Sequence, residues 1–311
     1  MIIDETIPAA LAGERLDRLV ALVSGASRAD AAVLVAAGGA SVDGDVCVTG
    51  KLRLTEGQHL VVDLDRLPQP QTPQPDASVL IDVVYEDAHI LVIDKAAGLV
   101  VHPGAGNPDK TLVNGLLARF PEIEHVGQEG RPGIVHRLDV GTSGLLVVAR
   151  TNEAYHVLVA ALSARDVGRR YRAFVWGIPA NAHGVIDAPI GRDHRDPMKM
   201  AVVIDGKSAR THYRTLNRYS SVGPVSELEC RLETGRTHQI RVHLTAIGHP
   251  VVGDLTYGGV KVAVSAPRPM LHAAALSFRH PITDEEMSFE SEVPDDLSAV
   301  VASLGPADES A

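Results

Sequence analysis

The segment 67–78 is the feature that most constrains how this chain folds. It reads Leu-Pro-Gln-Pro-Gln-Thr-Pro-Gln-Pro-Asp-Ala-Ser and contains four prolines in twelve residues. Proline fixes φ and lacks the backbone N–H donor, so a run of this kind continues neither a helix nor a central strand. We therefore predict a Pro-rich, extended and semi-rigid linker. It divides the 311 residues into a small module over 14–66 and a larger domain over 79–311.

The N-terminal module shows a helix followed by a hairpin. Ser27 is a favourable N-cap and Gly38 a favourable end for the helix between them. Two short strands, at 40–42 and 46–48, are joined through Asp43-Gly44, a typical hairpin turn. This order resembles the small RNA-binding domain named after a small-subunit ribosomal protein, in which two helices pack on a little sheet. The resemblance implies a small α/β RNA-binding module.

The charge of this module does not match that of a strong RNA-binding domain. Residues 14–66 carry six basic and eight acidic side chains, and its predicted second helix, 29–37, has no basic residue. The formal net charge of the whole chain is -10, but residues 192–243 hold ten Lys or Arg against six acids. We therefore expect any nucleic-acid binding to depend mainly on the larger domain.

The larger domain is rich in strand signals. Strands are predicted at 90–95, 171–176, 199–204, 208–217 and 227–233, and helices at 110–120, at 152–166 and from within 234–244 to about Gly248. The helices do not alternate regularly with the strands, which argues against a doubly wound parallel sheet. We predict an α+β fold with a mixed, mainly antiparallel sheet.

A Gly-rich polar turn within 133–150 is the strongest candidate for a functional site. Two short apolar strands are predicted on either side of it, and the turn carries one acid, one base, two hydroxyls and two glycines: Asp139, Arg137, Thr142, Ser143, Gly141 and Gly144. Both glycines permit backbone conformations that other residues resist. Asp and Gly are also ordinary turn formers, so the simplest interpretation of the turn alone is a tight hairpin with a solvated carboxylate.

Metal and nucleotide cofactors are not predicted. The chain has 14 histidines, but none lies in a His-x-x-x-His arrangement, and His238 and His243 do not share a helical face. No Gly-rich loop follows a strand in the dinucleotide or Walker pattern. His194-Arg195-Asp196 imitates a kinase tripeptide, but the other kinase motifs are absent from the sequence.

The sequence also predicts no export and no membrane partner. Residues 1–5 lack a basic region followed by an apolar core, and no apolar run reaches membrane-spanning length. Cys47 and Cys230 are far apart and match no metal or redox spacing, which favours a reducing compartment. We expect a cytoplasmic protein, and a monomer, because no exposed apolar face stands out.

What remains is a carboxylate among basic and hydroxyl side chains. Such a carboxylate can act as a covalent nucleophile at a sugar or base carbon. A nearby cation would keep it ionised and oriented. An ordinary glycosidase needs a second carboxylate across the scissile bond, whereas the motifs here offer Arg and Tyr instead.

Six sequence blocks, in one order and spacing, resemble those of a single enzyme family. The first block, 136–144, is similar to the signature of the RluA/RluD-type RNA pseudouridine synthases, and it reads His-Arg-Leu-Asp followed by Thr142-Ser143-Gly144. The others are Asp94-Lys95 to His102-Pro103, Arg170-Tyr171-Arg172-Ala173 to Gly177, Gly191-Arg192-Asp193 with Met200-Ala201-Val202, Thr234 to His243, and His249-Pro250 with Gly253-Asp254 and Tyr257-Gly258-Gly259. The resemblance covers about residues 14–281 and implies the pseudouridine synthase fold.

The resemblance implies an isomerisation without a cofactor. A uridine is flipped out of the RNA, its N-glycosidic bond is cut, and the base rotates and rejoins through carbon. Asp139 would be the nucleophile, attacking either the ribose or the uracil ring. Tyr171 would stack on the target base, and Arg241 would pair with Asp139. Residues implied in substrate binding are Arg137, His136, Thr142, Lys95, Arg192, Arg236 and His238.

The resemblance leaves several alternatives open for the substrate and the activity. The order of module, linker and catalytic domain resembles family members that act on large-subunit ribosomal RNA, so rRNA or a ribosome precursor is the expected partner. Other members act on transfer RNA. A catalytically silent RNA-binding or ribosome-assembly protein on the same fold is a further alternative, and so is a nucleoside or nucleotide hydrolase that uses Asp139.

Overall fold

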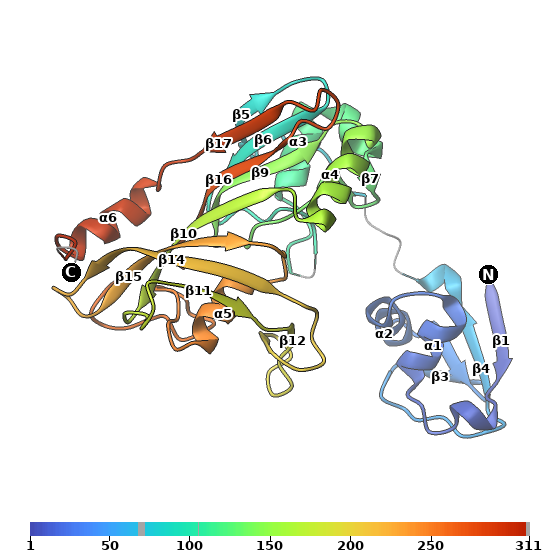
Figure 1. Ribbon diagram of the computed structural model, residues 1–311. Coiled ribbons are helices and arrows are strands. Elements are labelled where there is room, and N and C mark those ends of the chain that lie inside the picture. Colours follow the sequence, from blue (N-terminus) through green and yellow to red (C-terminus); the bar gives the residue numbers. More distant parts are fainter. Residues whose placement is uncertain (68–71, 105, 309–311) are drawn as a thin grey trace. The chain divides into compact units, whose positions relative to one another are not determined.

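The computed structural model describes residues 1–67, 72–104 and 106–308, and the chain divides into two compact units, 1–71 and 72–311 (Figure 1). Four positions of the predicted linker, 68–71, lie outside the described residues. The remaining positions, 72–78, form neither helix nor strand. Each unit has a hydrophobic core of its own.

The N-terminal unit packs two helices on a four-stranded antiparallel sheet. The strand order is β1-β4-β2-β3, and the bounds are Ile2–Thr6 (β1), His59–Asp63 (β4), Ala40–Val42 (β2) and Asp45–Cys47 (β3). The helices are α1 (Leu16–Ser24) and α2 (Arg28–Ala36), and short 3-10 turns lie at Ala9–Leu11 and Leu64–Arg66. Because β1 pairs with β4, this unit starts well before residue 14.

The local signals in this unit act as the sequence indicated. The Ser27 side chain accepts a hydrogen bond from the Asp30 backbone N–H, which is the expected N-cap of α2. Asp43 and Gly44 both have positive φ, 51° and 91°, as a two-residue hairpin turn requires. The second hairpin strand lies one residue earlier than predicted, at Asp45–Cys47.

The larger unit is built on a nine-stranded sheet. The order along the sheet is β11-β14-β15-β10-β16-β9-β6-β5, and β17 also pairs with β16. In that order the strands span His183–Asp187, Arg210–Tyr219, Val225–Leu232, Gly168–Trp176, Leu271–Arg279, Ser143–Ala149, Ile90–Lys95 and Asp82–Glu86, and β17 spans Glu286–Glu290. Every pairing is antiparallel except the short parallel contact between β16 and β9. The predicted α+β, mainly antiparallel fold is therefore confirmed.

Helices and two small ribbons complete this unit (Figure 1). The helices are α3 (Leu112–Arg119), α4 (Asn152–Ala164), α5 (Gln239–Ala246) and α6 (Asp295–Ser303), with a 3-10 helix at Pro121–His125. The ribbons pair β12 (Ile190–Arg192) with β13 (Met200–Val202) and β7 (Gly127–Gln128) with β8 (Arg131–Pro132).

Strands β6 and β9 form the rigid centre beside which the candidate site lies. All seven residues of β9 are buried, and five of the six residues of β6 are buried. Both strands read as nearly continuous apolar runs, as strands covered on both faces do. The loop with Asp139 leads directly into the first residue of β9.

The prediction of two strands around this loop was half wrong. Only the second strand, β9, forms, and before the loop the chain makes a single bridge between Ile134 and Val148. A side chain takes the place of further backbone pairing, because the Val147 N–H donates to Nε2 of His136 at 3.0 Å. Gly133, with a φ of 71°, turns the chain away from an extended course just before this point.

Candidate active site

The backbone of the Asp139 loop is held tightly against β16. The Thr142 N–H donates to the Asp139 carbonyl at 3.0 Å, which closes the turn. Gly144 has a φ of 111°, and a Cβ at this position would lie 2.3 Å from the Ala273 carbonyl oxygen. Only glycine fits such a close approach at positive φ. Gly141 has no positive φ, so the special conformation expected at both glycines belongs to Gly144.

Side chains behind the loop fix its course. The Arg268 guanidinium donates to the Gly141 carbonyl and to the Ser143 hydroxyl, both at 3.1 Å. Asp296 at the start of α6 accepts two hydrogen bonds from the same guanidinium, at 2.6 and 2.9 Å. Ser143 is therefore a structural residue of the loop, as hydroxyls in such turns commonly are.

Arg241 on α5 bridges two carboxylates. Its Nη1 donates to Oδ2 of Asp139 at 3.2 Å, and its Nε and Nη2 donate to the two carboxylate oxygens of Asp254 at 2.6 and 3.0 Å. The predicted ion pair with Asp139 is present, across 102 residues of sequence. Burial alone would lower the pKa of Arg241, but the hydrogen bonds and charge of Asp254, together with those of Asp139, raise it above its usual value. The guanidinium is therefore a permanent cation at Asp139.

Asp254 and Tyr257 hold the Arg241 guanidinium in place. Asp254 is fully buried, and its Oδ1 also accepts the backbone N–H groups of Thr256 and Tyr257. The Tyr257 ring lies under the guanidinium, with 5.0 Å between the Arg241 Cζ and the ring centroid. Neither residue was predicted as part of the site, although both stand in the last sequence block.

A strained turn starts α5 and so directs Arg241 toward the loop. His238 precedes the helix with a φ of 56°, a left-handed conformation that is uncommon for residues other than glycine. Its Nδ1 lies 2.8 Å from the Tyr257 hydroxyl oxygen. The Gln239 side chain accepts hydrogen bonds from the Thr234 hydroxyl and the Arg236 N–H, which closes the turn from inside.

Tyr171 is buried on β10 and lines the same cavity as Asp139. Burial raises the pKa of its phenol to about 12; the Asp139 charge acts in the same direction, while the Arg169 charge opposes it. The phenol is therefore neutral at physiological pH, and its ring is available as an apolar surface for a flat ligand.

The cavity has a volume of about 650 Å³, which lies within the range of small-molecule binding sites. Five of the predicted substrate-binding residues line it together with Asp139 and Tyr171: Arg137, His136, Thr142, Arg236 and His238. Arg137 is exposed at this cavity, and its guanidinium makes no ion pair with any described residue. Thr142 is buried beneath the turn.

His136 is a neutral acceptor in this cavity. Burial, with a further effect of the Arg169 charge, lowers the pKa of its imidazole to about 3. The ring is thus unprotonated at physiological pH, as its acceptance of the Val147 N–H requires. Through this hydrogen bond His136 holds the segment before the Asp139 loop against β9.

Two predicted substrate-binding residues do not reach the cavity. Lys95 is only 1% exposed, and its Nζ donates to the carbonyls of Ala96 and Leu99 at 2.7 and 2.9 Å. Burial lowers the pKa of its ammonium to about 8. Arg192 lies on β12, where its Nη1 donates to the Pro197 carbonyl. In this structure Lys95 therefore supports the 96–99 turn, and Arg192 lies on a separate ribbon.

The described part of the chain offers neither a metal site nor a membrane-spanning helix. Within residues 1–67, 72–104 and 106–308, no three His, Cys, Asp or Glu side chains are arranged to hold a metal ion. Over the same residues, no helix is long and apolar enough to cross a membrane.

Comparison with known proteins gives a consistent result. Residues 89–246 match the family model described as RNA pseudouridylate synthase. The chain is 45% identical to the "Ribosomal large subunit pseudouridine synthase D" of Xanthomonas campestris pv. campestris, over 96% of this chain and 91% of that protein. It is also 45% identical to the protein of the same name from Pseudomonas aeruginosa, over 94% and 92% of the two chains.

A solved structure shows the same similarity in three dimensions. The structure described as "Human RNA Pseudouridylate Synthase Domain Containing 1" superposes with a TM-score of 0.56 at 29% sequence identity. The match covers 76% of this chain and all of that one.

Proposed function

The chain belongs to the RNA pseudouridylate synthase family, and from this premise we propose that Asp139 is the nucleophile of its reaction. The protein is an isomerase that converts uridine in RNA to pseudouridine. The observation that carries the assignment is the ion pair that Arg241 makes with Asp139, whose side chain lines the same cavity as Tyr171. A carboxylate that accepts a hydrogen bond from a fixed cation is held in one orientation for attack.

The reaction exchanges one bond to the ribose for another. The bond between C1′ of the ribose and N1 of uracil breaks, and a bond between C1′ and C5 forms. N1 gains a proton and C5 loses one, so the composition of the RNA does not change and no cofactor is required. Asp139 attacks either the ribose or the uracil ring.

Tyr171 and Arg241 have different roles in this proposal. Arg241 holds the Asp139 carboxylate, and the Tyr171 ring supports the flipped base. Once Asp139 has formed a covalent bond, its negative charge is gone. Burial is the main cause of the raised pKa of Tyr171, and that charge adds to it, so loss of the charge makes the phenol easier to deprotonate. In this proposal the phenol gives its proton to N1 of the detached uracil and then takes up the proton that C5 loses.

Arg137 and the cavity rim would bind the RNA around the target uridine. Arg137 is exposed beside Asp139 and makes no ion pair with the described residues, so its charge is available to the RNA. Arg236 and His238 lie in the same cavity lining. The base enters this cavity only when it has left the RNA stack, which costs a few kcal/mol.

For the substrate we propose large-subunit ribosomal RNA. The support comes from relatives that are named as ribosomal large-subunit pseudouridine synthases and that match along nearly their whole length. The N-terminal unit adds little positive charge, because Arg15 and Arg28 both pair with Asp17, and Arg18 pairs with Glu14.

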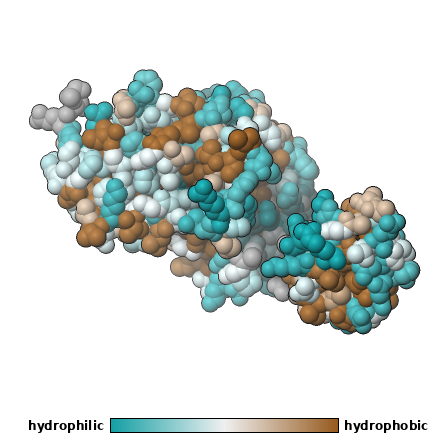
Figure 2. Space-filling model, turned by 90° about the horizontal axis from the view of Figure 1, so that it is seen from below, coloured by the Kyte–Doolittle hydropathy of each residue, from teal (hydrophilic) through white to brown (hydrophobic). Residues whose placement is uncertain are grey.

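We also propose a cytoplasmic monomer. On the face shown in Figure 2, apolar side chains occur in groups separated by polar ones rather than as one continuous surface.

The test maps pseudouridines in ribosomal and transfer RNA from cells with and without this protein. We expect specific positions in large-subunit rRNA to lose the modification and to regain it when the gene is restored. The Asp139→Ala gene serves as control and should not restore them. Loss of transfer-RNA positions alone would overturn the substrate. Restoration by Asp139→Ala would overturn the catalytic assignment, and release of free uracil by purified protein would indicate a hydrolase.

A further inference from the structure

Arg169 is a buried cation that the reaction proposed above does not use. It lies on β10 two residues before Tyr171, it is only 6% exposed, and both side chains line the cavity of Asp139. Its Nη2 donates to the backbone carbonyl of Glu233 at 3.3 Å. Within the described part of the chain, its Nε has no hydrogen-bond partner and its guanidinium makes no ion pair. Burying an unpaired charge is costly, so this arrangement requires a reason.

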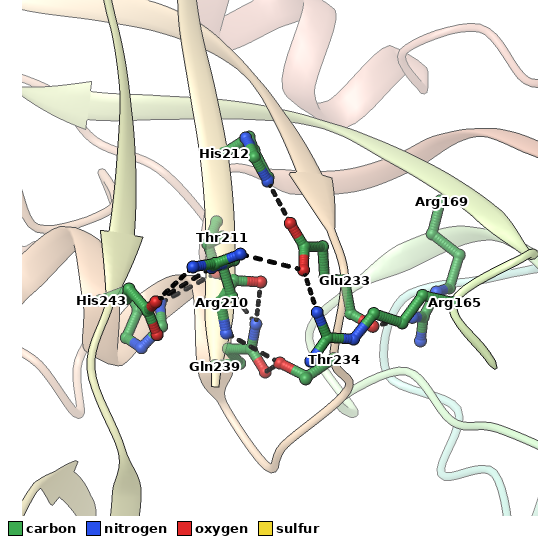
Figure 3. Close-up of polar contacts among 10 residues, drawn as sticks. Arg165, Arg169, Arg210, Thr211, His212, Glu233, Thr234, Gln239 and His243 are labelled. Carbon is green, nitrogen blue, oxygen red and sulfur yellow. Dashed lines mark hydrogen bonds and ion pairs between the residues drawn. The ribbon is translucent and has the colours of Figure 1, made fainter. Parts of the chain in front are cut away.

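The side chain of Glu233, whose backbone Arg169 contacts, already has other partners. Figure 3 shows Glu233 surrounded by other partners: Arg165 at 2.5 Å and His212 at 2.6 Å, with Arg210 at 3.7 Å. Arg169 reaches only the backbone of this residue. Its positive charge is therefore left without a compensating charge from the protein.

The rest of the cavity has the same excess of positive charge. Its lining contains two carboxylates, Asp139 and Glu233, of which the first is paired with Arg241 and the second with the cluster in Figure 3. The lining also contains five arginines: Arg165 is a partner of Glu233, and the other four, Arg131, Arg137, Arg169 and Arg236, make no ion pair with a described residue. Gly235 borders the guanidinium of Arg169, since a Cβ there would lie 3.0 Å from Nη1. A small residue at this position leaves space beside the cation.

We propose that Arg169 binds a backbone phosphate of the RNA next to the flipped uridine. This inference rests on the proposed function, because it takes the anion from the RNA substrate. Its Nε is buried in the free protein, whereas Nη1, which makes no hydrogen bond with a described residue, can donate to a phosphate oxygen. Most of the desolvation of this side chain has already occurred before RNA arrives, so the charge-assisted bond forms with little of that cost. Because the cation lies inside the cavity, it is reached only by a strand whose target base has left the stack.

The contact would also couple recognition to chemistry. Arg169 and Tyr171 share one face of β10, so a phosphate bound at Arg169 fixes the backbone close to the residue that supports the base. Arg165, Arg137 and Arg236 would draw the strand toward the cavity. Arg169 would hold a single phosphate at one position along it.

The test uses RNA that the purified full-length protein converts to pseudouridine, so that the proposed function is established in the same experiment. A set of these RNAs carries one neutral methylphosphonate linkage each, at successive positions around the target uridine. For wild-type protein we expect one linkage adjacent to that uridine to weaken binding about 10- to 100-fold, as loss of a charge-assisted hydrogen bond does. Linkages further away should have smaller effects.

The variant Arg169→Met should bind unmodified RNA more weakly than wild-type protein by a similar factor. Its affinity should not fall further when the sensitive linkage next to the uridine is made neutral. Arg170→Met is the matched control, because Arg170 follows on the same strand but is exposed and pairs with Glu290 and Glu229. Any loss of affinity caused by Arg170→Met should add to the loss caused by each methylphosphonate linkage. If Arg169→Met does not fold, Arg169→Lys should still weaken binding at the same linkage.

Two results would overturn the proposal. One is a wild-type scan in which no linkage near the uridine stands out, a measurement that needs no variant. The other is an Arg169→Met protein whose loss adds fully to that of every linkage. If no RNA is converted at all, the proposed function fails instead, and the two failures are thereby distinguished.

Discussion

Arg241 offers the sharpest separation of stability from catalysis in this protein. It is 7% exposed and lies between Asp139 and the fully buried Asp254. In Arg241→Met the Asp254 carboxylate stays buried without its cation. Removing one partner of a buried ion pair costs about 3–5 kcal/mol, which lowers the Tm of a unit of this size by roughly 6–20 °C.

The double variant Arg241→Met/Asp254→Asn removes that uncompensated charge. The Asn oxygen still accepts the N–H groups of Thr256 and Tyr257 that bind Oδ1 now, so most of the lost stability should return. Asp139 nevertheless remains without the group that orients it. Misplacing a reacting group by about 1 Å costs on the order of 10²-fold in rate, and we expect kcat to fall by at least this factor.

The assay pairs thermal unfolding with single-turnover pseudouridine formation for the wild type and both variants. Arg279→Met is the control, because Arg279 is exposed and its partners among the described residues, Asp284 and Glu286, are exposed too. It should change neither quantity. A stable double variant with wild-type kcat would refute the role of Arg241 in positioning Asp139, and an unchanged Tm in Arg241→Met would refute the energetic argument.

Three further perturbations test the supports of the site. Gly144→Ala should lower the free energy of unfolding by more than about 4 kcal/mol, because the added Cβ would collide with backbone atoms. Gly98→Ala is the control: Gly98 also has a positive φ but lies in open space, so the loss should be about 1–2 kcal/mol. Denaturant titration measures both. Arg268→Met should lower kcat about 10²-fold with KM nearly unchanged, since Arg268 holds the loop and not the RNA; an equal rise in KM contradicts this. Burial lowers the pKa of His136 in the folded protein to about 3, whereas the same imidazole in the unfolded chain takes up a proton near pH 6.5. As pH falls below about 6.5, protonation therefore favours the unfolded chain and the free energy of unfolding decreases. His136→Gln should reduce this slope by up to about 1.4 kcal/mol per pH unit between pH 6 and 5, and an unchanged slope would refute it.

Features with a local physical cause were predicted from sequence. The helix predicted at 152–166 is observed at Asn152–Ala164, with the Thr151 side chain as its N-cap. The mainly antiparallel sheet followed from strand signals that do not alternate with helices. The pairing of Arg241 with Asp139 was available only through the family resemblance, since no spacing rule joins residues 102 apart.

Features decided by tertiary contacts were not predicted. Nothing near Lys95 in the sequence shows that its ammonium is buried on backbone carbonyls rather than facing RNA. The strand expected before Asp139 is replaced by the His136 side chain, a competition that alternation of apolar residues does not reveal. The sequence shows only that Arg169 precedes Arg170. It does not show that Arg169 lacks an ion-pair partner, because this depends on the other partners of Glu233 in the folded chain.

The Asp139 carboxylate is the group that we propose to react with the substrate. The most direct measurement is single-turnover conversion of a uridine-labelled RNA by wild-type protein and by Asp139→Asn, which keeps the size of the side chain and removes its charge. Nucleophilic attack by this carboxylate predicts that the variant binds the RNA and forms no pseudouridine. Conversion at the wild-type rate by Asp139→Asn would contradict the claim.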